Sequence, residues 1–447
     1  MVNIYNFLKN AFRDLIKENK INSSFIPLLL LLLTIPLSYA INNIALGLYF
    51  VIVLVKLKKD NIVLEKNLLI PILLYLFMIL SFTWSIDRQS TLSALSKEIS
   101  LLIIPVSFLF SIGFSKEQKE KIIRCFSYSI VFFAFYYCIR AIIRYLLFHD
   151  SRVFFYHGEN NYDYGLVPKL LNAIHVSVFV AIAFFYFFTK KVKTNKDNLL
   201  ATFLFLFILL LSSKNIILIV ILLTLSYVFF FSKSAHKMRL RNIFVFSTIV
   251  ALVFSVGKIK SRFQEEFKSN SNISLSSNVI NGTPQGVHFV SLNEAWSNPS
   301  FSPNDYFPGT AFRVYQFRIF TELITENNIF LTGLGLNASM SKINEKAIHY
   351  NLYLGNETLE GYQTKNFHNQ YVQNFAELGL IGFLLLILLL IINIKNALKS
   401  KDFIHFAFSI LMISLFLTES FLWRQRGVVF FTVMYCLFNS KNVNHNS

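Results

Sequence analysis

Residues 366–394 read NFHNQYVQNFAELGLIGFLLLILLLIINI, a polar segment followed directly by a long apolar run. The apolar part matches the roughly 20 residues that a helix needs to cross a bilayer. His368, Asn369 and Glu377 therefore lie at the mouth of a predicted transmembrane helix. Polar groups there are costly unless a partner or a function satisfies them. This stretch thus indicates both the fold class and a candidate site.

The rest of the chain repeats the apolar pattern. Hydrophobic residues make up 54% of the 447 positions, and phenylalanine alone accounts for 50. Lipid offers no partner to backbone groups, so runs of this kind must be helical. We predict an all-α polytopic membrane protein with about 12 transmembrane helices. The predicted spans are residues 25–41, 44–57, 68–85, 99–114, 122–147, 170–189, 199–213, 215–232, 243–257, 371–394, 403–422 and 428–439.

The distribution of charge predicts the orientation. The formal net charge is +18, but lysines and arginines gather at alternate connections, such as KLKKDNIVLEK (56–66) and TKKVKTNKDN (189–198). This pattern is typical of cytoplasmic loops and gives no indication of nucleic-acid binding. Both termini are predicted to be cytoplasmic. We expect the amphipathic leader, residues 1–22, to lie at the membrane interface and not to act as a cleavable signal peptide.

One connection is much longer than the others. We predict an N-terminal transmembrane bundle of about nine spans (1–257), a periplasmic loop domain (258–369) and about three C-terminal transmembrane helices (370–447). So long a loop usually folds and has a function. Its second half contains a predicted helix, TAFRVYQFRIFTELITENN (310–328), and then a tight turn, TGLGLN (332–337).

Ionisable residues in or beside the apolar runs fall toward the outer side in this orientation. Their clustering favours a common cavity there, since simple membrane anchors would be scattered. Other interpretations stay open: snorkelling for the arginines, a hydrogen bond within the bundle for His175, a solvated hairpin for Lys214 and a structural role for Glu377. Gly379 and Gly382 are expected to serve close helix packing. The clustered residues are Lys97, Glu98, Arg140, Arg144, His175, Lys214, His368, Glu419, Arg424 and Arg426.

Several cations near the outer leaflet suit a diphosphate ligand. Arginine can bind phosphate oxygens through two parallel hydrogen bonds, and lysine supplies a point charge. His368 and Asn369 begin a helix, whose N-terminal dipole favours an anion and a neutral imidazole that can accept a proton. The sequence has no nucleotide-binding glycine loop, no HExxH motif and no metal-ligand spacing at its three cysteines. We therefore predict no metal and no cofactor.

Several motifs resemble those of the O-antigen ligase and O-antigen polymerase superfamily, enzymes that use polyprenyl-diphosphate-linked glycans outside the bacterial inner membrane. FHNQYVQNFAELGLIGF (367–383) is close to the family's His-Asn and Glu-x-Gly-Leu-x-Gly pattern. The layout, with one large outer loop before the His-Asn helix, agrees over nearly the whole length. The other similar stretches are FRVYQF (312–317), TGLG (332–335), LLLSSKN (209–215), FTWSIDRQSTLSALSKEISLLIIPVSF (82–108) and TESFLWRQRGVVFF (418–431).

This resemblance implies roles for individual residues. Arg313 corresponds to the family's loop arginine that binds the donor diphosphate, and His368 corresponds to its catalytic loop histidine. Lys214 stands where the family usually has a second arginine, and Phe317 where tryptophan is common. Arg318 would point about 140° away from Arg313 on a regular helix, so Arg313 is preferred. We expect diphosphate contacts from Arg313, Lys214, Arg140 and Arg144, and support from Asn369, His175, Glu377, Arg318 and Arg424.

The predicted activity is metal-independent transfer of a glycan from a polyprenyl (undecaprenyl) diphosphate to an acceptor hydroxyl on the periplasmic side. Inversion is expected for a single displacement. An O-antigen ligase that acts on lipid A core, in lipopolysaccharide biosynthesis, is favoured by the TESFLWRQRGVVFF motif. A polysaccharide polymerase with the same donor is the first alternative. A flippase or other transporter is the second, although no similar halves are visible, and a structural scaffold is the third. The sequence does not indicate the oligomeric state.

Overall fold

The computed structural model describes residues 2–58, 62, 64–156, 165–231, 288–356 and 360–443. Within these residues the chain is mostly helical, as predicted. The predicted span 243–257 and the polar first part of the long loop lie outside the described residues. The helices before the loop are α1 (Val2–Ile21), α2 (Phe25–Leu33), α3 (Tyr39–Val55), α4 (Lys66–Ser81), α5 (Arg88–Glu98), α6 (Ser100–Phe110), α7 (Lys116–Phe148), η2 (Ser151–Phe154), η3 (Lys169–Leu171), α8 (Ala173–Thr189), α9 (Asn195–Leu211), α10 (Lys214–Ser226) and the π-helix η4 (Tyr227–Phe231).

A cap of residues 288–356 and 360–367 precedes the last helices. Its two short strands pair in parallel, with His288 opposite Asp305. The elements of the cap are β1 (His288–Phe289), α13 (Leu292–Ser297), β2 (Asp305–Tyr306), α14 (Gly309–Glu326), α15 (Ser339–His349) and η6 (Tyr362–Thr364). After the cap come α16 (Gln370–Ser400), α17 (Phe403–Leu415), η7 (Phe421–Trp423) and α18 (Gln425–Asn439).

In the part of the chain that the structure describes, four helical stretches are long and apolar enough to cross a membrane: Arg88–Phe110, α7, Lys214–Phe231 and α16. Shorter apolar helices, α3, α4, α8 and α17, accompany them. The protein is therefore a multi-pass membrane protein by the length and composition of its helices. The count of twelve spans stays a prediction.

The first predicted span, 25–41, is divided in the structure. α2 ends at Leu33 and α3 begins at Tyr39, because Pro36 in the intervening turn has no backbone N–H to continue a helix. Ser38 then caps α3, since its Oγ accepts a hydrogen bond from the N–H of Ile41 (3.4 Å). The nine residues of α2 rise only about 14 Å, less than the thickness of a bilayer core.

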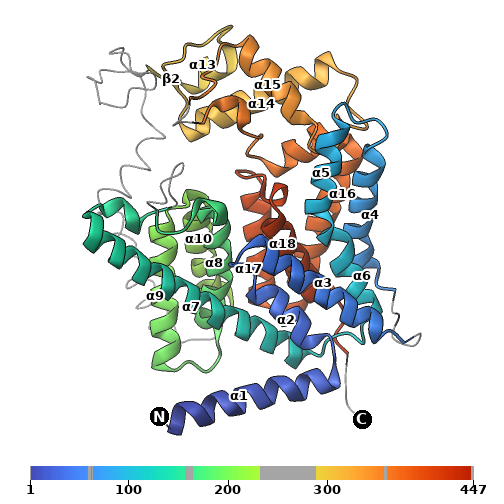
Figure 1. Cartoon of the computed structure of the whole chain (residues 1–447), viewed down its shortest axis with the longest axis vertical. Helices are drawn as coiled ribbons and strands as arrows, with labels where there is room; N and C mark the ends of the chain where they lie inside the picture. Colours follow the sequence, from blue (N-terminus) through green and yellow to red (C-terminus); the bar gives the residue numbers. More distant parts are fainter. Residues whose placement is uncertain are drawn as a thin grey trace.

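Figure 1 shows the cap at one end of the molecule, and α1 with both chain ends at the other. α1 lies across that end, beneath the bundle, as expected for an interfacial helix. It is held to α7 by Lys121, whose Nζ lies 2.8 Å from Asp14 Oδ1 and 2.5 Å from Glu18 Oε1. This arrangement agrees with the predicted separation of the long loop from the termini. Which end faces the cytoplasm stays a prediction.

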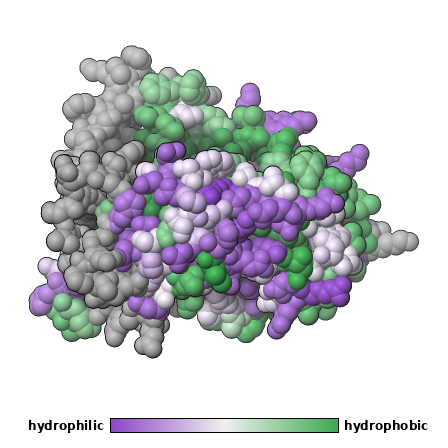
Figure 2. All heavy atoms as spheres, turned by 90° about the horizontal axis from the view of Figure 1, so that it is seen from above, coloured by the Kyte–Doolittle hydropathy of each residue, from purple (hydrophilic) through white to green (hydrophobic). Residues whose placement is uncertain are grey.

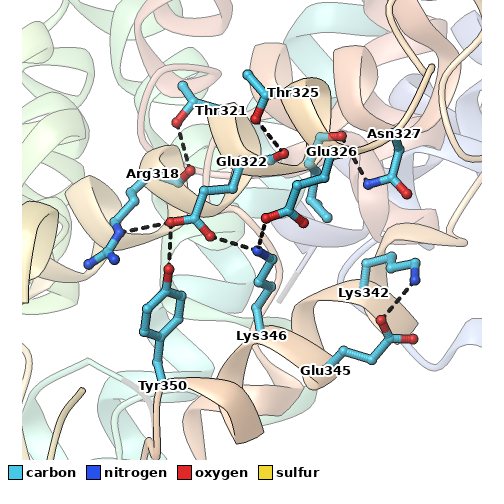
Figure 3. A network of polar contacts seen from close by, with 11 residues as sticks. Arg318, Thr321, Glu322, Thr325, Glu326, Asn327, Lys342, Glu345, Lys346 and Tyr350 are labelled. Carbon is cyan, nitrogen blue, oxygen red and sulfur yellow. Dashed lines mark hydrogen bonds and ion pairs between the residues drawn. The ribbon is translucent and has the colours of Figure 1, made fainter. Parts of the chain in front are cut away.

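The cap has a hydrophobic core of its own, which includes Ile319, Leu323 and Ala347 and continues into Val372 and Ala376 at the start of α16. Polar contacts between α14 and α15 close its outer side (Figure 3). Seen from above, hydrophilic side chains gather across the middle of this end of the molecule, and hydrophobic ones lie toward its edge (Figure 2). The cap is thus a folded unit that rests on the membrane helices.

The glycines of ELGLIG do more than allow close packing. Gly379 has φ 62° and ψ −163°, so it interrupts α16. A Cβ at this position would lie 2.3 Å from the backbone of Leu331. The interruption frees backbone groups of α16 to bind residues 330–336 of the cap, which we call the cap turn, so Gly379 allows close packing against the backbone of the cap. The hydrogen bonds run from Leu334 N to Ala376 O (2.9 Å), Gly335 N to Glu377 O (2.8 Å) and Leu380 N to Phe330 O (2.8 Å).

The same cap turn is also bound by the FTWSIDRQST segment that precedes and begins α5. Three hydrogen bonds join residues about 250 positions apart, so these two motifs fix the cap to the bundle. They run from Trp84 Nε1 to Thr332 O (3.0 Å), Ile86 N to Leu334 O (3.1 Å) and Thr91 Oγ1 to Leu336 O (2.7 Å).

Candidate functional site

The residues between α17 and α18 form the centre of the candidate site. We call this segment, residues 416–424, the hub loop. It contains η7 and receives side chains from the cap, from the start of α16 and from the start of α10. Two of the residues singled out in the sequence, Arg313 and His368, meet at consecutive positions of this loop.

Arg313 lies in the first half of α14 and binds the hub loop through its guanidinium group. Its Nε and Nη2 donate to the carbonyl oxygen of Thr418 (3.2 and 2.9 Å), and Nη1 donates to Gly309 O (3.0 Å). A guanidinium has five N–H donors, so two remain to bind another acceptor. The side chain is only partly buried. Arg313 is therefore held in place and can still bind an anion.

His368 lies beside a buried carboxylate that the sequence interpretation did not pair with it. Its Nδ1 is 3.6 Å from Oε2 of Glu419, whose side chain is 8% exposed, against 30% for His368. Asn366 Oδ1 accepts the backbone N–H of His368 (3.0 Å), and the ring of Phe312 lies against the imidazole (5.9 Å between centroids). With Nδ1 toward Glu419, the opposite nitrogen, Nε2, is directed away from the carboxylate.

Glu419 follows α17 and lies outside the membrane-spanning helices. Burial by itself raises the pKa of this carboxyl, but the neighbouring His368, His175 and Arg313 lower it to about 2. The contact with His368, which favours the ionised carboxylate, is the largest influence that opposes the cost of burial. Glu419 is therefore a buried anion at neutral pH, placed to orient and charge-balance His368.

The polar residues at the mouth of α16 hold it against the hub loop. Asn369 caps the helix, since its Oδ1 accepts the N–H groups of Tyr371 and Val372 (3.0 and 3.1 Å). Its Nδ2 also donates to Leu417 O (3.2 Å). Gln370 adds two further bonds to the loop. These bonds satisfy groups that would otherwise be costly at this depth, and they explain the polar start of this helix. The backbone N–H of Gln370 donates to Phe416 O (2.8 Å), and its Oε1 accepts from the backbone N–H of Leu422 (2.8 Å).

Gln373 and Glu377 form a second polar layer beneath His368. Gln373 Oε1 accepts from the backbone N–H of Phe367 (3.3 Å) and from Ser420 Oγ (3.4 Å), the neighbours of His368 and Glu419. Its Nε2 donates to Ser339 Oγ (3.1 Å) and to Glu377 Oε1. Glu377 is buried and accepts from Ser339 as well (2.9 Å). It thus supports the backbone around the site and does not approach His368 directly.

A small polar cavity lies behind this layer, between α5, α16 and η7. Glu98 is buried on its wall, and Lys97 lies over the ring of Trp423, 5.7 Å from the centroid. Trp423 Nε1 in turn donates to Asn337 Oδ1 (2.8 Å), which links the hub loop to the cap turn.

Lys214 reaches the same hub through its neighbour in the α9–α10 hairpin. Asn215 Nδ2 donates to Ser414 O (2.9 Å) and to Thr418 Oγ1 (2.7 Å). Lys214 is the first residue of α10 and is partly buried. Its ammonium adds to the positive end of that helix. The hairpin thus brings Asn215, the neighbour of Lys214 in the chain, to the residue whose carbonyl binds Arg313.

His175 and Arg424 flank the hub loop on another side. His175, in the first turn of α8, is 1% exposed and stacks on Phe421 (4.3 Å between centroids). Among the described residues, neither ring nitrogen has a hydrogen-bond partner. Arg424 is the N-terminal cap of α18 and is partly buried. His175 interacts electrostatically with Glu419, and Arg424 interacts electrostatically with His175.

Arg426 has a structural role. Its guanidinium donates to Ile35 O (3.2 Å), Leu170 O (2.5 Å) and Leu37 O (2.6 Å) and lies 4.1 Å from the centroid of the Tyr39 ring. These bonds satisfy two carbonyl groups in the turn that follows α2 and one in η3.

Other sequence candidates lie elsewhere. Arg318 points toward α13 and α15, where it donates to Glu322 Oε1 (2.9 Å) and Asn298 O (2.7 Å), as Figure 3 shows for the first of these bonds. Arg144 donates to Gly165 O (3.2 Å), and Arg140 lies one turn earlier on α7. These hydrogen bonds of Arg144 and Arg318 thus lead to residues other than Arg313, His368 and the hub loop.

Sequence reasoning missed the roles of Glu419, Thr418 and Gln373. Glu419 lies inside the TESFLW motif. A single acidic residue just beyond an apolar run can indicate a buried partner for a cation. Nothing in the local sequence pairs residue 418 with residue 313. Gln373 could have been found because it lies on the polar stripe formed with Gln370 and Glu377 at helical spacing.

Part of the candidate site lies in a region of the chain that is similar to a known protein family. Residues 200–387 match a family model described as O-antigen ligase. The match begins in α9 and ends in α16, so it includes Lys214, Arg313 and His368 but not Glu419. A comparison with curated proteins found no match.

Proposed function

We propose that this chain, whose residues 200–387 match a family model described as O-antigen ligase, transfers a glycan from a polyprenyl diphosphate carrier to an acceptor hydroxyl. The cap would lie on the periplasmic side of a bacterial inner membrane. The proposed acceptor is lipid A core, which makes the protein an O-antigen ligase.

One observation carries this proposal. Arg313 and His368 are 55 positions apart, on a cap helix and before a membrane helix, yet they contact adjacent residues, Thr418 and Glu419. A diphosphate-binding cation beside an oriented imidazole is the pair that glycan transfer from a lipid diphosphate requires.

In the proposed reaction the acceptor oxygen forms a bond to the anomeric carbon as the bond from that carbon to the diphosphate oxygen breaks. The diphosphate leaves with additional negative charge. The two remaining N–H donors of Arg313 and the ammonium of Lys214 would stabilise that charge where it develops. A single displacement of this kind inverts the configuration of the anomeric carbon.

The proton of the acceptor hydroxyl goes to Nε2 of His368, which the contact with Glu419 directs away from the carboxylate. Glu419 then balances the charge of the imidazolium. Gln373 holds the neighbouring residues, Phe367 and Ser420, so that histidine and carboxylate keep their relative positions. These steps need no metal ion.

The polymerase alternative uses the same donor and differs only in the acceptor. Deletion of the gene separates the two: naked core with long glycans left on the carrier indicates a ligase, and a single repeat unit on the core indicates a polymerase.

The proposal is tested by reconstituting the full-length protein in vesicles with a lipid-linked glycan. Arg313→Ala and His368→Ala should each reduce transfer at least 100-fold, because each removes a group that acts on the transition state. Lys342→Ala, which removes a partly exposed cation of the same cap, is the matched control and should behave as wild type. Near-normal transfer by both site variants would reject the mechanism.

A further inference from the structure

Two large aromatic side chains are unexpectedly exposed on the cap. Trp296 of α13 is 45% exposed and Phe317 of α14 is 48% exposed. Their rings stack on each other, with centroids 6.3 Å apart and planes inclined by 27°. A contiguous exposed apolar surface can mark a binding site, so the extent of this one matters.

These rings belong to a continuous series that leads down to the membrane. Phe317 contacts Phe320 (5.9 Å between centroids), Phe320 contacts Phe375 (5.5 Å), and Phe375 contacts Phe383 in α16 (5.6 Å). We call Trp296, Phe317, Phe320, Phe375 and Phe383 the aromatic strip. Ring contacts join the outer cap to the apolar part of α16, although Phe320 itself is buried in the core of the cap, so a ligand would contact the other rings of the strip.

The lower end of the aromatic strip lies on α16, which also carries exposed apolar side chains. Ile381, Leu384 and Leu388 of α16 are 43%, 53% and 40% exposed, at the spacing of one helical face. Phe330 and Leu331, which are 50% and 59% exposed, lie between this face and the cap, since Leu380 N donates to Phe330 O (2.8 Å). A chain that leaves the bilayer here stays in contact with apolar side chains.

The upper part of the aromatic strip lies beside the candidate site. Phe317 is four residues after Arg313, so both side chains project from the same face of α14. Phe320 contacts Phe367, the residue before His368 (6.2 Å between centroids). The strip therefore connects the bilayer to the cation and to the histidine of the site.

We infer that the aromatic strip binds the isoprenoid chain of the lipid-linked donor and guides it from the bilayer to Arg313. The inference rests on the proposed function. It favours an isoprenoid diphosphate over a protein partner because the apolar surface begins at the membrane and ends at a cation, which matches a ligand with an apolar tail and an anionic head.

The test uses two donors with the same glycan diphosphate, one on undecaprenol and one on geraniol, which is too short to follow the strip. Phe383→Ala, at the membrane end of the strip, should raise KM for the long donor about tenfold and leave KM for the short donor unchanged, because a short chain bound at Arg313 does not reach this end. Tyr306→Ala removes another exposed cap aromatic, 39% exposed and outside the strip, and should change neither value. Phe317→Trp should retain wild-type KM.

An equal effect on both donors would show that the strip only anchors the cap to lipid, and would overturn the inference. So would an unchanged KM for the long donor. If wild type transfers glycan from neither donor, the proposed function itself fails, and this result is distinct from the other two.

A second measurement does not depend on the variants folding. Wild-type protein is irradiated with an undecaprenyl diphosphate that carries a diazirine near the diphosphate. Labelling of α13 or α14 supports the inference, and labelling confined to membrane helices away from the strip contradicts it.

Discussion

Glu419→Gln is the substitution that isolates the proposed role of the carboxylate. The change keeps the size of the side chain and removes its charge, 3.6 Å from His368 Nδ1. Two unit charges at that separation interact with about 5 kcal/mol at an effective dielectric constant of about 20. Because the side chain of His368 is 30% exposed, solvent reduces this to roughly half. A loss of about 2–3 kcal/mol in the transition state corresponds to a fall in kcat of roughly 30- to 150-fold.

The assay is steady-state glycan transfer by full-length protein in vesicles, with kcat and KM determined separately. KM for the donor should stay within about twofold, because Arg313 and Lys214 are unchanged. Glu419→Asp, which keeps the charge at a greater distance, should recover part of kcat. Glu360→Gln neutralises an exposed cap carboxylate and is the control. A kcat for Glu419→Gln within threefold of wild type would refute the reasoning, provided that the variant unfolds at the wild-type temperature.

Three further predictions follow from the same contacts. Arg313→Lys should raise KM for the donor tenfold or more, since lysine cannot hold both the Thr418 carbonyl and a phosphate in a fixed geometry; binding of a labelled donor measures this. Gly379→Ala should lower the unfolding temperature and the yield of folded protein, because of the positive φ and the 2.3 Å approach to the cap turn, whereas Gly47→Ala, with open space around it, should not. Glu360 accepts hydrogen bonds from two lysines that lower its pKa to about 2, so its stabilisation is present above the unfolded pKa of about 4.3 and is lost as pH falls through about 2. The unfolding temperatures of wild type and Glu360→Gln should therefore converge on acidification. At neutral pH the free energies of unfolding should differ by at most about 1 kcal/mol, since the ion pair is half exposed.

Much of the fold could be predicted because its signals are local. Apolar runs of sufficient length give membrane helices, and the TGLGLN stretch gives a turn. The family resemblance selected Arg313, and the helical angle predicted that Arg318 points elsewhere. The structure places the two guanidinium groups in different networks, as that angle requires.

What could not be predicted depends on contacts between distant residues. The bond from Arg313 to Thr418 spans 105 positions, and neither local sequence records it. The interruption of α16 at Gly379 occurs because the cap turn binds the freed backbone groups, so helix propensity alone gives an unbroken helix. The division of 25–41 was readable from Pro36 and Ser38, but the apolar pattern continued past them.

The most direct test of the account is a structure of the protein, in a lipid nanodisc, with a non-transferable analogue of a polyprenyl-diphosphate glycan. The account predicts the diphosphate in hydrogen-bond contact with Arg313 and the anomeric carbon facing Nε2 of His368. A diphosphate bound on another face of the cap, or at the end of the molecule where α1 lies, would contradict it.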